Sequence, residues 1–333
     1  MKHPVITLGH GSGGGETFRL IRNVILKIFR DPVLGRLEDA ADVLVKRGRT
    51  AFTTDSYVVD PIFFPGGDIG RLAVCGTVND LAMKGAVPRY IAMALIIEEG
   101  FALADLERIL KSASRAAREA GVAIVCGDTK VVPHGKADKI FINTSGIGEI
   151  RIQVGRDRIR PGDAVITSGT IADHGIAVLN ARLDLGLHSG IKSDTAALGG
   201  LTGRLHPFGR AIRFMRDPTR GGLASVLNEA AAGMKWGIVI DERSVPVRPA
   251  VRGACGLLGL DPFYIANEGK FIAVVDRLFS QKIVRKMQAD PLGRQACVIG
   301  RIVREPRGVW LATSISGMRP IIMLEAEGLP RIC

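Results

Sequence analysis

The sequence predicts an α/β (α+β) protein with two domains. Apolar, β-branched segments alternate along the chain with segments whose apolar residues recur at helical spacing. A polar stretch over 155–162, which contains a Pro-Gly turn signal, divides this alternation into two sets of similar content. The 333 residues suit two domains of ordinary size. We expect an N-terminal domain over residues 1–153, a C-terminal domain over 154–325 and a flexible tail over 326–333.

Strands and helices of the first domain follow from local patterns. A helix is expected near 16–28, after a glycine-rich stretch. Helical periodicity over 69–82 and 102–120 predicts two further helices, and Gly121 ends the second. β-branched and apolar runs predict strands at Thr50–Tyr57, Tyr90–Ile96, Val122–Val125 and Lys139–Ile147.

The second domain repeats this alternation. Helices are expected from Asp173, from about Thr219 to Ala232, and over Phe279–Gln288. Apolar runs predict strands at Ala164–Ser168, Gly237–Ile240, Phe271–Val275 and Val309–Thr313.

The composition limits the class of protein. The longest strongly apolar stretch, Tyr90–Ile97, is too short to span a bilayer, and the N-terminus lacks the apolar core of a signal peptide, so we expect a soluble, cytoplasmic protein. The net charge of +12 suits either a solvated basic surface or an acidic partner. Basic residues are scattered and aromatic residues are few, which disfavours nucleic-acid binding.

The five cysteines form no Cys-x-x-Cys pair, so we expect reduced thiols and no zinc ribbon. Cys75, Cys126, Cys255 and Cys297 have apolar neighbours and are expected in cores. Cys333 is the final residue of the chain. Such an end is either an incidental thiol or a mobile carrier that can enter a pocket. About seven extended residues would reach roughly 23 Å.

A glycine-rich loop precedes the first predicted helix. Backbone amides of such a loop can converge on phosphate oxygens, and a helix N-terminus favours an anion. The loop lacks the Gly-Lys-Ser/Thr of a Walker A sequence, so a flexible N-terminal loop remains an equal alternative. The candidate phosphate contacts are Gly11, Ser12, Gly13 and Gly14.

Aspartates interrupt apolar segments of the first domain at four places. Any one of them alone could be a turn or cap residue. Four together make a site for Mg²⁺ and a nucleotide plausible, because Mg²⁺ prefers oxygen ligands and bridges to phosphate. These residues are Asp39, Asp55, Asp80 and Asp128.

Three further polar residues are candidates for chemistry. Lys130, in Gly-Asp-Thr-Lys, could neutralise phosphate or move a proton, or be a solvated loop lysine. Arg220 could clamp a phosphate, and Thr219 beside it could cap a helix. Glu268, in Asn-Glu-Gly, could be a base or a plain loop acid.

Taken together, these segments resemble the HypE family of hydrogenase maturation factors, which are carbamoyl dehydratases. That family belongs to the superfamily of aminoimidazole ribonucleotide synthetase, selenophosphate synthetase and thiamine-monophosphate kinase. The resemblance extends over nearly the whole chain, and the ending Pro330–Cys333 is its most specific part. The other matching motifs are His10–Gly14, Thr54–Val59, Phe63–Gly70, Gly76–Ala82, Gly127–Val132, Asp173–Gly175, Arg216–Gly222 and Asn267–Gly269.

The resemblance implies a two-domain aminoimidazole ribonucleotide synthetase-like fold, a homodimer, and ATP and Mg²⁺ as cofactors. It implies that the Cys333 thiol receives a carbamoyl group from the carbamoyltransferase HypF. ATP-dependent dehydration would then give a thiocyanate, whose cyanide passes to the HypC–HypD scaffold complex for [NiFe]-hydrogenase.

The resemblance also implies residue roles. Cys333 would carry the substrate, while Glu268 and Lys130 would handle protons. The four aspartates named above would hold Mg²⁺. The nucleotide would contact the glycine loop together with Asp55, Asn79, Asp80, Thr129 and Arg220.

Other readings remain. A selenophosphate synthetase would carry a nucleophilic cysteine near the N-terminal glycine loop, whereas the first cysteine here is Cys75. A small-molecule kinase would not need a terminal thiol. A nucleic-acid-binding protein would show salt-sensitive binding. A scaffold that holds assembly partners would bind them without hydrolysing ATP.

Overall fold

The N-terminal domain is built on a four-stranded sheet with helices on one face. The computed structural model describes residues 4–12, 15–37, 40–41, 43–45, 48–186, 190–323, 329 and 331–333. The strand order is β1-β6-β4-β5, so that β1 and β5 are the two edges. The bounds are β1 Thr50–Tyr57, β6 Ile140–Ile150, β4 Ala86–Glu98 and β5 Ala123–Val132.

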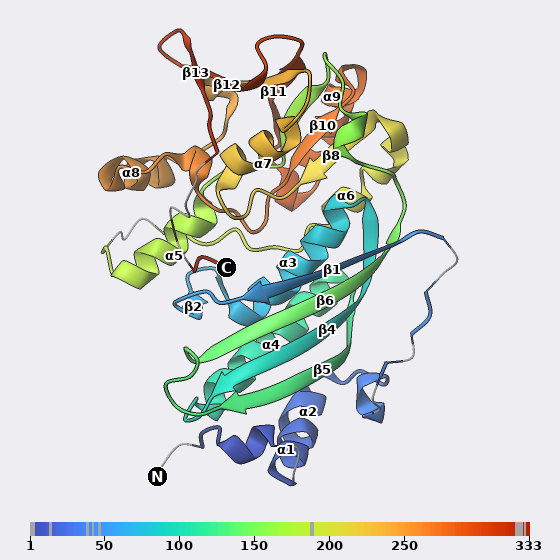
Figure 1. Cartoon of the computed structure of the whole chain (residues 1–333), viewed down its shortest axis with the longest axis vertical. Helices are drawn as coiled ribbons and strands as arrows, with labels where there is room; N and C mark the ends of the chain where they lie inside the picture. The colour runs from blue at the N-terminus through green and yellow to red at the C-terminus, as the bar shows by residue number, and fades with distance from the viewer. Residues whose placement is uncertain are drawn as a thin grey trace.

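Helices α3 (Ile69–Met83) and α4 (Leu103–Ala120) cover one face of this sheet (Figure 1). Asp68 caps α3 by accepting hydrogen bonds from the amides of Gly70 and Arg71. Helix α4 connects the parallel pair β4 and β5, and it ends at Gly121, whose left-handed backbone suits glycine.

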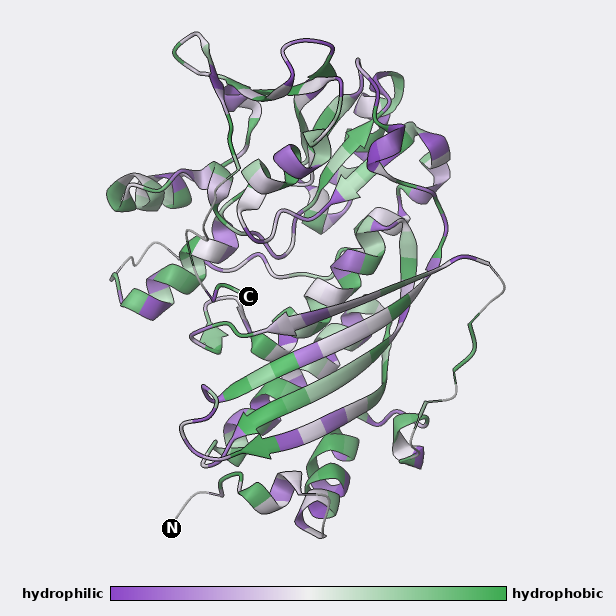
Figure 2. Ribbon diagram, viewed as in Figure 1, coloured by the Kyte–Doolittle hydropathy of each residue, from purple (hydrophilic) through white to green (hydrophobic). Residues whose placement is uncertain are grey.

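In the part of the chain that the structure describes, no helix covers the opposite face of the sheet (Figure 1). Along β1 the side chains alternate between buried and exposed, and Phe52 on the open side is 71% exposed. Ile96 of β4 is exposed on the same face. Figure 2 shows hydrophobic positions along the central strands β4 and β6, with hydrophilic positions on the edge strands. We call this surface the open face.

A helical segment lies beside the β5 edge (Figure 1). It consists of α1 (Gly15–Leu20), a π-helical turn (Ile21–Ile25) and α2 (Leu26–Phe29). Its apolar residues Val24, Ile25, Ile28 and Phe29 pack against the core beneath α4. The segment therefore places the glycine loop at the β5 side of the domain.

The C-terminal domain contains a seven-stranded sheet of order β13-β12-β9-β11-β7-β10-β8. Its pairs are antiparallel except for β12 with β9. The strands are β7 Ala164–Thr167, β8 Ile212–Arg216, β9 Gly237–Asp241, β10 Ile272–Val275, β11 Cys297–Val303, β12 Gly308–Ala312 and β13 Met318–Pro320. The helices are α5 Asp173–Leu183, α6 Gly199–Gly203, α7 Gly222–Ala231, α8 Pro249–Leu258 and α9 Ser280–Gln288.

Helix α3 joins the two domains. Every residue of α3 except Arg71 and Asp80 is buried. Its last turn, Ala82 and Met83, packs into the core of the C-terminal domain, while Val178 and Ala266 of that domain pack into the core of the first. The two sheets therefore lie on either side of one buried helix, and the space beside that helix is shared by both domains.

The structure corrects several local predictions. The Gly127–Lys130 segment was expected to follow a short strand, but it lies inside β5, because β4 continues alongside it as far as Glu98. Asp55 lies within β1 and Asp80 within α3, so neither is a turn residue. Thr219 does not cap α7, whose N-cap is Gly221. Strands β8 and β11 and helix α8 were not predicted.

None of the helices formed by the described residues combines the length and the apolar character needed to cross a lipid bilayer.

Candidate active site

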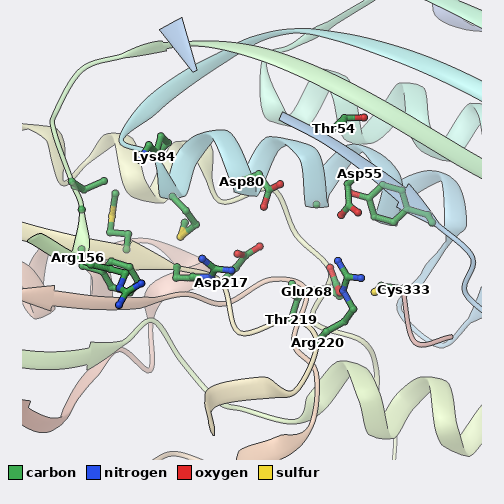
Figure 3. A pocket seen from close by; sticks show the side chains of 18 of the residues that line it. Thr54, Asp55, Asp80, Lys84, Arg156, Asp217, Thr219, Arg220, Glu268 and Cys333 are labelled. Atoms are coloured by element: carbon green, nitrogen blue, oxygen red, sulfur yellow. The ribbon is translucent and has the colours of Figure 1, made fainter. Parts of the chain in front are cut away.

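A cleft of about 840 Å³ lies between the domains, beside α3 (Figure 3). Strand β1, helix α3, strand β8, the turn that follows β8 and the last residue of the chain all contribute to its walls. Its ionisable or thiol-bearing side chains are Asp55, Tyr57, Asp80, Lys84, Arg156, Asp157, Arg216, Asp217, Arg220, Glu268 and Cys333.

Carboxylates from five separate segments line this cleft. Burial and the charge of Asp55 raise the pKa of Asp80, although Thr53 donates a 2.8 Å hydrogen bond to its carboxylate. Burial and the charge of Asp80 raise the pKa of Asp217 to about 7. These groups repel one another, so a cation or a proton would stabilise them.

Glu268 is 2% exposed, and its Oε1 has no hydrogen-bond partner among the described residues. Burial, together with the charges of Asp217 and Asp194, raises the pKa of Glu268 well above its usual range. A buried carboxyl with a raised pKa binds a proton more readily than an exposed one and can exchange it with a bound group.

The backbone around Glu268 is fixed from several directions. Its amide donates to the Asp194 carboxylate at 3.1 Å. The side chain of Asn267 accepts from the amide of Ala172 at 2.7 Å and donates to the carbonyl of Pro218. These bonds explain why an Asn-Glu-Gly sequence holds a buried acid at a defined place.

Asn79 of α3 also holds the backbone around Glu268 in place. Its amide nitrogen donates to the carbonyls of Ala196 and Glu268, and its oxygen accepts from the amide of Leu198 at 2.8 Å. Asn79 is 1% exposed. These bonds fix the position of the Glu268 backbone, and the predicted contact of Asn79 with the nucleotide stays a prediction.

Basic side chains supply the opposite charge. Arg216 forms an ion pair with Glu229 at 2.7 Å. Arg220 faces no carboxylate partner at ion-pair distance among the described residues, and Figure 3 shows its guanidinium projecting toward the end of the cleft where Glu268 and Cys333 lie. Arg220 is therefore free to bind an anionic ligand.

The end of the chain lies inside the cleft. Cys333 lines the cavity, and its main-chain oxygen accepts a hydrogen bond from the amide of Val58 at 3.1 Å. The amide of Asp60 donates to the carbonyl of Arg331 at 3.2 Å. Ile332 is 2% exposed and belongs to the core of the N-terminal domain. The last three residues therefore dock beside the end of β1.

The remaining predicted residues form a second group on β5. Lys130 Nζ lies 3.7 Å from Asp128 Oδ1, and both side chains are mostly exposed. Gly11, Asp128, Thr129 and Lys130 line a smaller cavity of about 190 Å³. Ser12 lies beside Gly11 and donates to the carbonyl of Gly9. Three predicted residues, Gly13, Gly14 and Asp39, lie outside the described residues.

The sheet separates the two groups within one chain. Asp128 is in register with Ala94, Ala94 with Asn143, and Asn143 with Ser56. Three strand spacings amount to about 14 Å. The structure brings Asp55, Asp80, Arg220, Glu268 and Cys333 to one cleft, whereas Asp128 and Lys130 lie at the opposite edge.

Comparison with known proteins matches both halves of the chain. Residues 37–150 match the AIR synthase related protein N-terminal domain, and residues 160–311 match its C-terminal domain. The carbamoyl dehydratase HypE of Rhizobium leguminosarum bv. viciae is 49% identical over 98% of this chain and 95% of its own length. HypE of Escherichia coli K12 is 45% identical over 98% of this chain and 99% of its own length.

The chain belongs to the HypE family of carbamoyl dehydratases.

The fold agrees with that assignment. A crystal structure of the hydrogenase maturation protein HypE in complex with ATP superposes with a TM-score of 0.95, at 47% identity and with 98% of this chain and 99% of that chain covered. A chain from a crystal structure of a HypE–HypF complex superposes with a TM-score of 0.81, at 46% identity and with 92% and 99% covered. The predicted two-domain fold and the predicted family are confirmed.

The cleft of this HypE family member suits a nucleotide with Mg²⁺ better than a metal held by protein alone. Among the described residues, no group of three His, Cys, Asp or Glu side chains is placed to hold a metal ion. Mg²⁺ normally takes one or two carboxylates and completes its shell with water and phosphate oxygens. The mutually repelling Asp55, Asp80 and Asp217 are hard oxygen donors of the kind that Mg²⁺ prefers.

Sequence reasoning missed Asp217, His174 and Arg182. Asp217 lies inside one of the matching motifs, between Arg216 and Pro218. A carboxylate next to an arginine there could have indicated a site residue. His174 and Arg182 contact the end of the chain from α5, and no local pattern indicates contacts over such a sequence separation.

Proposed function

We propose that the chain dehydrates a carbamoyl group carried as an S-carboxamide on Cys333, using ATP, and so supplies cyanide ligands for the maturation of [NiFe]-hydrogenase. The observation that carries this proposal is the position of Cys333, which lines a cleft of its own chain together with carboxyl groups and Arg220. Membership of the HypE family supports the same reaction.

The proposed chemistry has two steps. The carboxamide oxygen attacks the terminal phosphorus of ATP, one N–H proton leaves, and a phosphorylated imidate and ADP are formed. The second N–H proton then leaves, the C–O bond breaks, and phosphate departs to give S–C≡N. In total, R–S–C(O)NH₂ and ATP become R–S–C≡N, ADP, phosphate and one proton. Phosphorylation turns a poor leaving group into a good one.

Glu268 is our candidate for proton handling near the sulfur. Both steps remove a proton from nitrogen, and a carboxyl group with a raised pKa can accept one and release it again. Its unpartnered Oε1 provides the acceptor, while Asn79 and Asp194 hold its backbone still.

Mg²⁺ and ATP would bind at the carboxylate side of the cleft. One or two of the carboxylates of Asp55, Asp80 and Asp217 would hold the metal, which would neutralise phosphate charge. Arg220 would bind a phosphate oxygen. The nucleotide complex of a relative with a TM-score of 0.95 supports a nucleotide site in this fold.

We further propose a homodimer, because Lys130 and Asp128 can join this site only from a second copy. Both lie in register with β4 residues whose side chains point to the open face. Two copies that meet through their open faces would bury Phe52 and bring the β5 edge of one near the β1 edge of the other. Gly11 would then approach the nucleotide from the partner's side, whereas the buried side chain of Thr129, in register with Leu95, points away from the open face.

The proposed partners follow from the family. HypF would donate the carbamoyl group, as a solved HypE–HypF complex supports. The HypC–HypD complex would accept the cyanide. We propose that these steps take place in the cytoplasm.

Intact-mass measurement tests the proposal. The protein is incubated with the carbamoyltransferase, carbamoyl phosphate and ATP, and the chain is weighed over time. We expect a carboxamide that forms first and a thiocyanate that forms only when ATP and Mg²⁺ are present. Cys333→Ala should abolish both mass changes. Modification that persists in Cys333→Ala would refute the carrier role and favour a kinase that acts on a separate small molecule.

A further inference from the structure

His174 makes a buried contact with the end of the chain. This residue on α5 is 0% exposed, and its Nε2 donates to the carbonyl of Ile332 at 2.9 Å. A carbonyl can only accept, so Nε2 carries the hydrogen. The other ring nitrogen, Nδ1, then accepts from the hydroxyl of Ser193 at 2.8 Å. Burial lowers the pKa of His174, which keeps this neutral form.

The imidazole is also held from behind. The edge-to-face contact with Phe64 has a centroid distance of 5.5 Å and an interplanar angle of 88°. Ser193 is fixed in turn, because its amide donates to the carbonyl of Pro65 at 2.8 Å and its hydroxyl lies 2.6 Å from that of Thr195. The ring has one orientation, and that orientation presents Nε2–H to the tail.

Arg182, two turns further along α5, binds the tail at a second point. Its Nε donates to the carbonyl of Asp60 at 2.7 Å, and one terminal nitrogen donates to the carbonyl of Arg331. One guanidinium therefore bridges the segment after β1 and the tail. This geometry uses the fixed fork of arginine, which lysine lacks.

These contacts recognise the backbone of the tail. His174 and Arg182 donate to the carbonyls of Ile332 and Arg331, while the amide of Val58 donates to the main-chain oxygen of Cys333. None of these bonds uses the sulfur, so a carboxamide or a cyano group on sulfur leaves them intact. The same contacts are therefore available to the docked tail whether its sulfur is a thiol, a carboxamide or a thiocyanate.

We propose that His174 and Arg182 are positioning residues that lock the tail with the Cys333 sulfur in the cleft for dehydration. This inference rests on the proposed function. The lock also limits access, because a carbamoyltransferase can reach the thiol only after Ile332 leaves the core and both contacts break. Loading of the carrier therefore requires an open lock, and dehydration requires a closed one.

The first test measures the lock without any catalysis. Cys333 is alkylated under native conditions with a maleimide, and the modified C-terminal peptide is quantified by mass spectrometry. We expect Arg182→Ala and His174→Gln to raise the alkylation rate at Cys333 at least about tenfold, since one or two hydrogen bonds to the tail are lost. Arg301→Ala, which removes an exposed arginine on β11, serves as the matched control and should leave the rate unchanged.

The second test separates loading from dehydration. We expect the two variants to accept the carbamoyl group at least as fast as the parent chain. Preloaded S-carboxamide should turn into thiocyanate about tenfold more slowly. A plain loss of stability would impair both steps, so thermal midpoints are measured in parallel. If His174→Gln does not fold, the result for Arg182→Ala decides whether the lock exists. Arg182 is only half-buried, so its replacement should leave the chain folded.

An unchanged alkylation rate in Arg182→Ala would overturn the lock. Equal slowing of loading and dehydration would overturn it as well. If the parent chain forms no thiocyanate, the proposed function fails, yet the alkylation test still decides whether the lock exists.

Discussion

The side-chain amide of Asn79 donates a hydrogen bond to the backbone carbonyl of Glu268 at 3.2 Å, across the boundary between the two domains. The same side chain bonds the carbonyl of Ala196 and the amide of Leu198. Helix α3, which forms one wall of the cleft, thereby fixes the position of the Glu268 backbone on the other wall.

Replacing Asn79 with Ala should destabilise the protein by about 1–3 kcal/mol, because it removes three hydrogen bonds to buried backbone groups. The measurement is the thermal midpoint of unfolding. Asn228→Ala is the control, since that half-buried side chain also bonds two carbonyls but lies nearer the surface. Equal, small effects in both variants would contradict a special role for Asn79.

Replacing Glu268 with Gln should slow dehydration by about 10²-fold or more, because the amide keeps the shape but loses the exchangeable proton. Stability should not fall, since the buried carboxyl that is replaced has one oxygen, Oε1, without a hydrogen-bond partner among the described residues. The measurement is the persistence of S-carboxamide on Cys333 under ATP. Glu107→Gln, at an exposed ion pair of α4, is the control. Normal thiocyanate formation in Glu268→Gln would rule out the proposed proton transfer.

Replacing Asp217 with Asn should change the pH dependence of stability. A raised pKa means that the folded chain binds the proton more tightly than the unfolded chain, so the parent loses stability as the pH rises from about 4 to about 7. The variant lacks this loss. At pH 8 it should exceed the parent by up to about 4 kcal/mol, and at pH 4 the difference should vanish.

Chemical unfolding of both proteins across this pH range measures whether the difference in the free energy of unfolding grows with pH as expected. A gap between the variant and the parent that stays constant with pH would show that Asp217 does not titrate in the folded chain. The charge of Asp80 contributes to the raised pKa of Asp217, so the size of the effect depends on both carboxyl groups.

Mixing Lys130→Ala with Cys333→Ala tests whether the site is shared between copies. Each variant alone should form no thiocyanate. In a mixed dimer, the intact Lys130 of one chain can serve the intact Cys333 of the other. Random exchange should then restore about a quarter of the parent yield per chain, since half of the dimers are mixed and each has one complete site. If the mixture stays inactive after exchange, Lys130 acts within its own chain or not at all.

Elements with a clear apolar period were predictable. Strand β1 and helix α4 lie where their patterns placed them, because each buries one regular face. Strand β5 was underestimated, since Asp128 and Lys130 are exposed on the open face while hydrogen bonds to β4 hold their backbone. Strand β8 was missed because Arg213 interrupts a short apolar run.

The site was predictable in residue type more than in arrangement. Asp55, Asp80, Glu268 and Cys333 come from motifs that chemistry alone singles out, and they face one cleft. Strand order is a long-range property, so nothing local places Lys130 at the edge opposite to β1. The contact between His174 and Ile332 spans 158 residues, and only the folded chain reveals it.

The docking of Cys333 in the cleft of its own chain changes what limits the proposed reaction. The substrate is already attached, so its local concentration is fixed by the length of the tail and does not depend on how much protein is present. Such a chain has no Michaelis constant for its acyl substrate. Each chain carries out one dehydration and must then transfer its cyanide and receive a new carbamoyl group. The supply of cyanide therefore depends on how often each chain is carbamoylated again.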